Sequence, residues 1–174
     1  MFKTLLLEKF LYNLSILSYY GLIKALSPFN EKARLWISGR RNIFKRLEET
    51  IGKDPKKLAW FHCASLGEFE QGRPLIEKFK IDFPGYKILL TFFSPSGYEI
   101  RKNYQHANYI FYLPIDSSGN ARKFLNIVNP SIVFFVKYEF WYHFISEIKS
   151  RGIPLISVSA IFRREQLFFK SYGK

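Results

Sequence analysis

The chain has little of what several classes of protein require. Its 174 residues contain a single cysteine, Cys63, which excludes a disulfide framework and a zinc site built from thiolates. The three histidines do not have the spacing of metal ligands, so we expect no metal site. The sequence also has neither the three-glycine dinucleotide fingerprint nor a Gly-Lys-Ser/Thr phosphate loop, and we therefore expect no nucleotide cofactor.

Acidic residues are scarce. Fourteen Asp and Glu stand against 27 Lys and Arg, which gives a formal net charge of +13 and calls for an anionic partner: nucleic acid, a membrane surface or a phosphorylated substrate. Twelve basic and five acidic residues lie in residues 1–57, and six of these basic residues lie between Lys32 and Arg46 with no acid among them. Because 48% of the residues are hydrophobic, the chain is expected to fold rather than to remain disordered.

A long uncharged apolar run is also missing. The longest such stretch near the N-terminus, Phe10 to Ile23, has 14 residues, whereas a spanning helix needs about 20. We therefore expect residues 1–28 to form an apolar helix that anchors the chain by lying in the membrane interface. An alternative is a helix packed within a soluble protein. One face of the helix would carry Leu7, Phe10, Leu11, Leu14, Leu17 and Leu22.

Residues 29–57 are expected to form a basic amphipathic helical segment, separated from the first helix by Pro28 and Asn30. Its cations between Lys32 and Arg46 would lie against anionic lipid, where each contributes about 1 kcal/mol. The apolar residues that interleave with these cations are Trp36, Ile37, Ile43 and Phe44.

Residues 58–174 alternate short apolar runs with amphipathic stretches, which predicts an α/β fold with a parallel sheet and helices on both faces. The expected strands are Leu58–Ala64, Lys87–Phe93, Tyr109–Leu113, Ile132–Val136 and Leu155–Val158. The expected helices are Glu68–Phe83, Ser96–Tyr104, Ser118–Val128, Phe140–Arg151 and Arg163–Tyr172. Ligands of such sheets bind beyond the carboxyl ends of the strands, so the loops at those ends are the candidate site.

The loop after the first strand contains Ser65, Gly67 and Glu68. Ser65 and Glu68 have the spacing of a capping box, which is the structural interpretation. In the functional interpretation, Gly67 lets a ligand approach the backbone and Glu68 takes a proton from a sugar hydroxyl. His62 and Cys63, just before this loop, are expected to be core residues.

Two further strand-end loops carry polar residues. Ser94, Ser96 and Gly97 lie at the start of a helix, where they either cap the helix or bind a phosphate or sugar. Lys137 and Glu139 follow a wholly apolar strand, and they either pair with each other or line the cleft.

Five segments in this order resemble the 3-deoxy-D-manno-octulosonic acid (Kdo) transferase family, in its N-terminal half. They are WFHCASLGEFEQGRPLI (60–76), LLTFFSPSGYE (89–99), YLPIDSSGNARKFL (112–125), FFVKYEFW (134–141) and RGIPLISVSAIF (151–162). The resemblance implies a Rossmann-like acceptor-binding domain over residues 58–174, the N-terminal domain of a GT-B glycosyltransferase whose donor-binding domain is absent from this chain.

The resemblance also implies a reaction. The family transfers Kdo from CMP-Kdo to a lipid A precursor, with inversion and without a metal, on the cytoplasmic face of the inner membrane. Glu68 matches the family's proposed catalytic base, and Glu139 and Trp141 match its Glu-Leu-Trp motif. Many members have a further Glu where this chain has Lys137, and a cation there is suited to developing phosphate charge.

Without its donor-binding half, the chain is expected to be inactive alone. Two other interpretations remain: another GT-B glycosyltransferase with a lipid-linked acceptor, and a non-catalytic module that binds anionic lipid. Nucleic acid is not expected as a partner, because the basic stretch adjoins an apolar helix and no nucleic-acid-binding motif is present.

Overall fold

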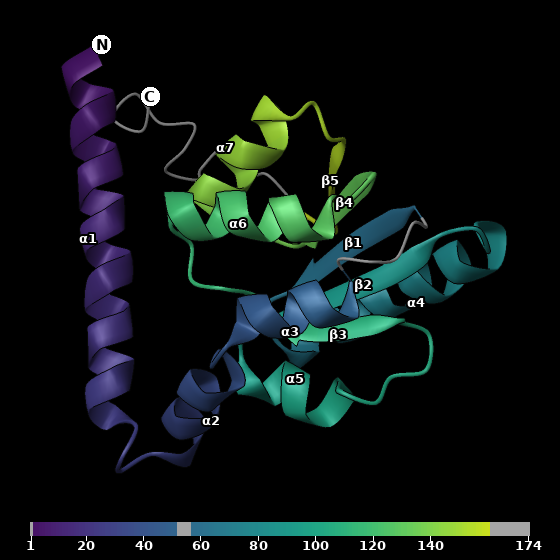
Figure 1. Ribbon diagram of the computed structural model, residues 1–174, viewed down its shortest axis with the longest axis horizontal. Coiled ribbons are helices and arrows are strands. Elements are labelled where there is room, and N and C mark those ends of the chain that lie inside the picture. The colour runs from purple at the N-terminus through teal and green to yellow at the C-terminus, as the bar shows by residue number, and fades with distance from the viewer. Residues whose placement is uncertain (1, 52–56, 161–174) are drawn as a thin grey trace.

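A parallel sheet of five strands forms the centre of the structure, a computed structural model that describes residues 2–51 and 57–160 (Figure 1). Every strand pairing is parallel. The expected α/β fold is confirmed, and each expected strand is present within one residue of its predicted end. The strands are β1 (Leu58–Cys63), β2 (Lys87–Phe92), β3 (Tyr109–Tyr112), β4 (Ile132–Val136) and β5 (Leu155–Val158).

The strand order is β3-β2-β1-β4-β5. The chain therefore moves outward from β1 to β3 and then returns to place β4 on the other side of β1. The order reverses between β1 and β4, and in open α/β sheets the crevice at this point is where ligands bind. The topology thus singles out the loops that follow these two strands.

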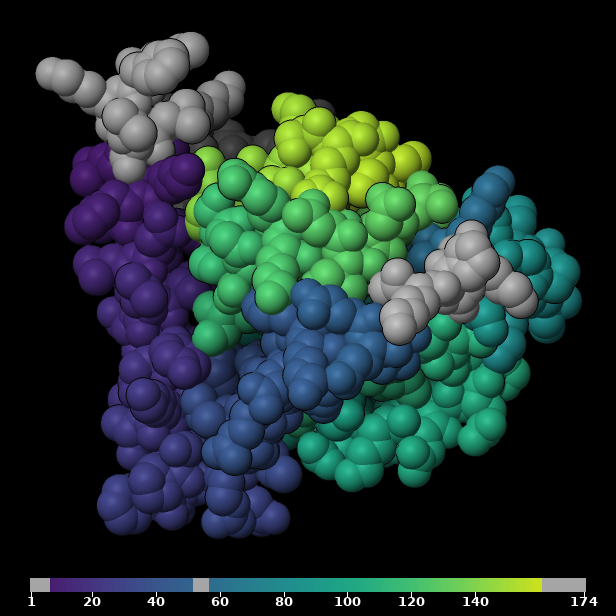
Figure 2. Space-filling view, viewed as in Figure 1, coloured from purple at the N-terminus to yellow at the C-terminus, as the bar shows by residue number. Residues whose placement is uncertain are grey.

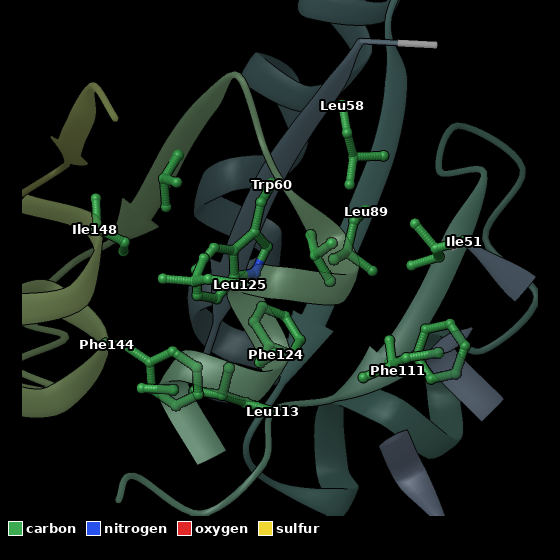
Figure 3. Close-up of a cluster of buried hydrophobic side chains, with 14 of the residues drawn as sticks. Ile51, Leu58, Trp60, Leu89, Phe111, Leu113, Phe124, Leu125, Phe144 and Ile148 are labelled. Carbon is green, nitrogen blue, oxygen red and sulfur yellow. The ribbon is translucent and has the colours of Figure 1, made fainter. Parts of the chain in front are cut away.

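Helices cover both faces of the sheet. The helices after the strands are α4 (Leu66–Asp82), α5 (Pro95–Arg101), α6 (Ser118–Val128) and α7 (Tyr142–Ser150). Side chains of α6 and α7 pack with Trp60 on one face, where the Trp60 ring lies 4.8 Å from Phe124 and 5.7 Å from Phe144 (Figure 3). On the other face, Phe69, Ile76 and Phe79 of α4 pack against Phe61 and its neighbours. The helix expected at 163–172 lies outside the described residues.

Three helices precede the sheet: α1 (Phe2–Leu26), α2 (Glu31–Gly39) and α3 (Ile43–Thr50). The expected break after α1 is confirmed, because Asn30 caps α2 by accepting a hydrogen bond from the backbone N–H of Ala33 at 3.0 Å. Figure 1 shows α1 along one side of the domain, with α2 and α3 leading from its end to the sheet.

The outer side of α1 is apolar and faces away from the domain. Six of its large apolar side chains, which helical spacing can place on one face, are 50–65% exposed. A helix with the length and hydropathy needed to cross a bilayer is not present in residues 2–51 or 57–160. We call this face the apolar ridge; it consists of Leu7, Phe10, Leu11, Leu14, Leu17 and Leu22.

The basic segment differs from expectation in its apolar residues. Trp36 and Ile43 do not face outward with the neighbouring cations; both are buried in the protein, and Ile43 belongs to the core cluster that covers one face of the sheet. Trp36 packs instead against Tyr19 and Tyr20 of α1. Their place among the cations in the sequence does not put these two side chains on the outer surface, because the domain itself offers them an apolar surface.

Candidate active site at the carboxyl edge of the sheet

Backbone hydrogen bonds join the first two strand-end loops. The carbonyl of Ala64, after β1, accepts hydrogen bonds from the N–H groups of Phe93 at 3.2 Å and Ser94 at 2.7 Å, after β2. The residues predicted from these two loops are therefore held next to each other, at the edge of the sheet where the topology places a ligand.

Glu68 lies in the first turn of α4, and its carboxylate accepts a hydrogen bond from the hydroxyl of Ser65. The side chain of Ser65 makes no capping hydrogen bond to the helix backbone, so the backbone bond of the predicted capping box is not formed. Its hydroxyl orients the carboxylate instead. Gly67 is exposed beside them, and a Cβ atom there would have no neighbour closer than 3.8 Å. The backbone at Gly67, next to Ser65 and Glu68, is therefore open to solvent.

Glu139 is held by two buried or half-buried rings. Its Oε2 atom lies 2.5 Å from the Nε1 donor of Trp141 and 3.3 Å from Nε2 of His62. His62 is fully buried in β1, as predicted, and its Nδ1 lies 2.9 Å from the hydroxyl of Thr91 in β2. The carboxylate is thus fixed to the carboxyl ends of the central strands. This link was missed, because sequence pattern alone does not pair a core histidine with a residue 77 positions later.

The charges of Glu68 and Glu139 both act on the thiol of Cys63. Cys63, at the end of β1, is fully buried, as predicted. Burial raises the pKa of its thiol well above the ordinary value, and the negative charges of Glu139 and Glu68 raise it further. Both carboxylates therefore lie near the last residue of β1, one in the loop after this strand and one in the loop after β4.

Lys137 has a left-handed backbone, with φ +67°, and its N–H donates to the carbonyl of Val158 at 2.7 Å. This conformation turns the chain directly after β4 while keeping the hydrogen bonding to β5. The predicted pairing of Lys137 with Glu139 is not observed among the residues that the structure describes. Glu139 is engaged by His62 and Trp141 instead, and the interpretation that Lys137 lines the cleft stays a prediction.

The serines of the second loop bind each other. Ser94 caps α5 by accepting from the N–H of Ser96 at 3.3 Å, and the two hydroxyls are 2.9 Å apart. Ser96 is exposed at the edge of the site. Gly97 is buried, and a Cβ atom there would lie 2.3 Å from the Phe92 ring. Glycine is therefore needed at this position for close packing, and the binding of substrate by Gly97 stays a prediction.

Arg40 connects α2 to this edge. Its guanidinium donates to the carbonyls of Leu113 at 2.9 Å, Phe93 at 2.8 Å and Trp36 at 3.0 Å, and it lies 3.8 Å from the centre of the Trp36 ring. Burial lowers the pKa of Arg40 to about 9, so the group keeps its charge at neutral pH. Arg40 was expected to face lipid with its neighbours; it serves instead to fix the ends of β2 and β3.

The helix α1 packs across the same edge of the sheet. The hydroxyl of Tyr12 donates to Asp116 at 2.5 Å, and Asp116 also accepts from the N–H groups of His143 and Phe144, each at 3.0 Å. Burial and the hydrogen bond to Asp116 raise the pKa of Tyr12. Asp116 is 1% exposed and was not selected from the sequence, since its partners lie on α1 and α7.

An apolar pocket of about 430 Å³ separates α1 from the strand-end loops. One of its walls is Trp141, the residue that also donates to Glu139. The pocket, which we call the α1 pocket, therefore connects α1 with the candidate site. Its walls are formed by Ser15, Ile16, Tyr19, Phe93 and Trp141.

Comparison with known proteins decides the family. The sequence profile described as 3-deoxy-D-manno-octulosonic-acid transferase (kdotransferase) matches residues 40–172, which is most of the chain. The chain belongs to the Kdo transferase family. The match covers the whole described sheet and all the strand-end loops, so the candidate site lies inside the region that defines the family.

Several curated relatives carry the same name. The 3-deoxy-D-manno-octulosonic acid transferase of Haemophilus influenzae is 27% identical over 146 residues, which cover 83% of this chain and 33% of the relative. That of Chlamydia trachomatis is 33% identical over 108 residues, 61% of this chain and 25% of the relative. That of Aquifex aeolicus is 31% identical over 109 residues, 62% of this chain and 29% of the relative. The chain thus spans about a third or less of the length of these Kdo transferases.

Among the predicted site residues of this Kdo transferase chain, the structure brings Ser65 and Glu68 together and places Glu139 near the same strand end. Ser94 lies beside them through Ala64. No cluster of three or more His, Cys, Asp or Glu side chains suited to a metal occurs in residues 2–51 and 57–160. The predicted site residues thus contribute two carboxylates, hydroxyls and one lysine to the described part of the chain.

Proposed function

We propose that the chain is the acceptor-binding half of a glycosyltransferase that moves Kdo from CMP-Kdo to a lipid A precursor. Family membership supports Kdo transfer, and the observation that carries the finer assignment is the position of Glu68. This carboxylate is oriented by Ser65 at the open carboxyl edge of the sheet, close to an apolar pocket that reaches α1.

In the proposed reaction, Glu68 is the general base. It accepts the proton of the acceptor hydroxyl while the hydroxyl oxygen forms a bond to the anomeric carbon of Kdo, and the bond from that carbon to the phosphate oxygen of CMP breaks. Attack opposite the leaving group inverts the anomeric centre. CMP is a good leaving group, so no strong general acid is required. Lys137 is suited to the charge that develops on the departing phosphate.

The proposed acceptor is a phosphorylated amphiphile, which fits two features of the chain. The α1 pocket is nearly all apolar and adjoins Trp141 and Glu139, so it could take an acyl chain next to the reacting hydroxyl. The net charge of +13 favours an acceptor that carries phosphates. The exposed apolar ridge supports contact with the membrane that holds this lipid, at the cytoplasmic face of the inner membrane.

Transfer of labelled Kdo to a tetra-acylated lipid A precursor tests the role of Glu68. We would join this chain to the remaining two thirds of the Haemophilus influenzae relative, and compare Glu68→Gln and Glu68→Ala with Glu31→Gln. Glu31 is an exposed carboxylate at the start of α2, far from the site in sequence. Loss of a general base is expected to lower kcat by about 10²- to 10⁴-fold, while Glu31→Gln leaves it unchanged. Equal rates for all three variants would remove Glu68 from the reaction.

The proposal also requires that the chain alone, without a donor-binding half, does not turn over CMP-Kdo. Incubation of the 174-residue chain with CMP-Kdo and the lipid A precursor should give no Kdo-containing lipid. Detectable transfer by the purified chain would contradict the division of binding between two halves.

A further inference from the structure

His62 is a fully buried titratable residue to which the proposed reaction gives no task. It lies in β1 with Thr91 of β2 as its partner in the parallel register, and both residues are fully buried. A buried imidazole has to use both of its ring nitrogens, because an unpaired polar group in the interior costs free energy. The partners of these two nitrogens therefore show which proton the ring carries and what it can do.

The hydroxyl of Thr91 fixes the Nδ1 side of the ring. Its oxygen accepts a hydrogen bond from Nε1 of Trp60 at 2.7 Å and lies 2.9 Å from Nδ1 of His62. The hydroxyl proton has two acceptors within reach, Nδ1 and the carbonyl oxygen of Phe61, and the carbonyl is farther away at 3.4 Å. Thr91 therefore donates to Nδ1, which then carries no proton of its own.

Glu139 fixes the Nε2 side of the ring. Its Oε2 atom lies 3.3 Å from Nε2 of His62, and its side chain is only 10% exposed. The single N–H of Trp141 lies 2.5 Å from this oxygen and 3.0 Å from Nε2, so it donates to the closer and charged acceptor. In the competing tautomer, Nδ1–H would donate to the carbonyl of Thr91 at 3.1 Å, and the lone pair of Nε2 would face the carboxylate. The proton is therefore on Nε2 and is donated to Glu139.

Both contacts use the same oxygen of Glu139. His62 and Trp141 contact Oε2, and Oε1 accepts no hydrogen bond from the residues that the structure describes. Trp141 is also a wall of the α1 pocket, whose other walls include Ile16 and Tyr19 of α1. Figure 2 shows the surface of α1 along one side of the domain. The free oxygen thus belongs to a carboxylate that is hydrogen-bonded to a wall of an apolar pocket.

We propose that His62 is a positioning residue that holds Glu139 in place for the acceptor. Its Nε2–H and the N–H of Trp141 fix Oε2, so that Oε1 accepts a hydrogen bond from a hydroxyl group of the acceptor whose acyl chain lies in the α1 pocket. Glu68 removes the proton of the reacting hydroxyl, whereas Glu139 orients the acceptor. The inference rests on the proposed function, because it assigns these residues a task in the binding of that acceptor.

The position of the imidazole proton tests the chain of hydrogen bonds directly in the 174-residue protein. Nitrogen-15 NMR with labelled histidine separates protonated from bare ring nitrogens, and His62→Gln identifies the signals of this residue among the three histidines. We expect Nε2 to be protonated and Nδ1 to be bare at neutral pH. Thr91→Val should move the proton to Nδ1, where the carbonyl of residue 91 can accept it, whereas Thr91→Ser should leave it on Nε2. A proton on Nδ1 in the parent would overturn the inference.

Binding of the acceptor tests the task of His62. The probe is a tetra-acylated lipid A precursor, and its Kd is measured for the 174-residue chain. The matched variants are His62→Gln, whose amide nitrogen can take the place of Nε2 and donate to Glu139, and His62→Asn, whose amide nitrogen reaches only the place of Nδ1. We expect Glu139→Ala and His62→Asn to raise Kd about tenfold, and His62→Gln to keep it within about threefold of the parent value.

The two histidine variants also separate positioning from stability. Each buries a polar amide in place of the ring, so a purely structural role predicts the same change in Kd for both. Equal Kd values for His62→Gln and His62→Asn would therefore overturn the positioning role. Absence of lipid binding by the parent chain would instead refute the proposed acceptor function, and with it the task of Glu139, while the NMR measurement would still report the proton on His62.

Discussion

Replacement of Asp116 by alanine should destabilise the chain more than any change at its surface. The buried carboxylate accepts three hydrogen bonds: one from the hydroxyl of Tyr12 on α1, and two from the N–H groups of His143 and Phe144 that begin α7. Asp116→Ala leaves all three donors without an acceptor. Loss of a helix cap costs about 1–2 kcal/mol, and each buried donor left unpaired costs about 1–3 kcal/mol.

These values give an expected loss of about 3–5 kcal/mol, after allowance for water reaching some of the freed donors. Asp116→Asn keeps one oxygen acceptor and should lose about half as much. Tyr12→Phe removes the bond that the hydroxyl donates to Asp116 and the one that it accepts from the N–H of Tyr142, and should lose about 1.5–3 kcal/mol. Urea denaturation followed by circular dichroism measures all three free energies of unfolding.

Asp82→Ala is the matched control, because Asp82 is an exposed carboxylate whose one ion-pair partner among the described residues is Lys78. It should change the free energy of unfolding by less than about 1 kcal/mol. A double-mutant cycle of Tyr12→Phe and Asp116→Asn should show a coupling free energy, since the two side chains are in direct contact. A loss below about 1 kcal/mol for Asp116→Ala would refute the inference that this carboxylate holds α1 and α7 to the sheet.

Two further predictions concern packing and pH. Gly39→Ala should lower the free energy of unfolding in urea by about 1–3 kcal/mol, because a Cβ atom there would lie 2.2 Å from the Tyr112 ring. Gly21→Ala is the control: a Cβ atom there has no neighbour within 4 Å, so the change should stabilise α1 by about 0.5–1 kcal/mol. A smaller loss for Gly39→Ala than for surface variants would contradict the close contact of α2 with β3. Burial lowers the pKa of His143 below 6.5, so the unfolded chain takes up this proton first as the pH falls. The free energy of unfolding should therefore decrease below about pH 6.5, less steeply in His143→Gln than in the parent; equal slopes would contradict this contribution.

The order of elements was predictable because each is written in a local pattern. The run of apolar residues in β4 and the alternation of short strands with amphipathic stretches identify a parallel sheet without any long-range information. The apolar ridge was also predictable, since helical spacing alone places Leu7, Leu14 and Leu17 on one side. The burial of His62 and Cys63 followed from their positions in a strand.

The contacts that organise the site were not predictable, because they join residues far apart in the sequence. Asp116 meets Tyr12 across 104 positions, and Arg40 meets Phe93 across 53. Arg40 also shows why charge patterning misled: a guanidinium surrounded by carbonyls and aromatic rings is stable in the interior, so its place in a basic run did not imply exposure. The Ser65–Glu68 spacing was similarly ambiguous, since the same two residues can cap a helix or bind each other.

The central proposal is that this chain holds the lipid acceptor while another part of the enzyme holds the donor. The most direct test is equilibrium binding of a tetra-acylated lipid A precursor and of CMP-Kdo to the 174-residue chain, each measured alone. We predict saturable binding of the lipid and at most weak binding of CMP-Kdo. Ile16→Glu in the α1 pocket should weaken lipid binding, whereas Ile81→Glu on the exposed side of α4 should leave it unchanged. Tight binding of CMP-Kdo without binding of the lipid would contradict the proposal.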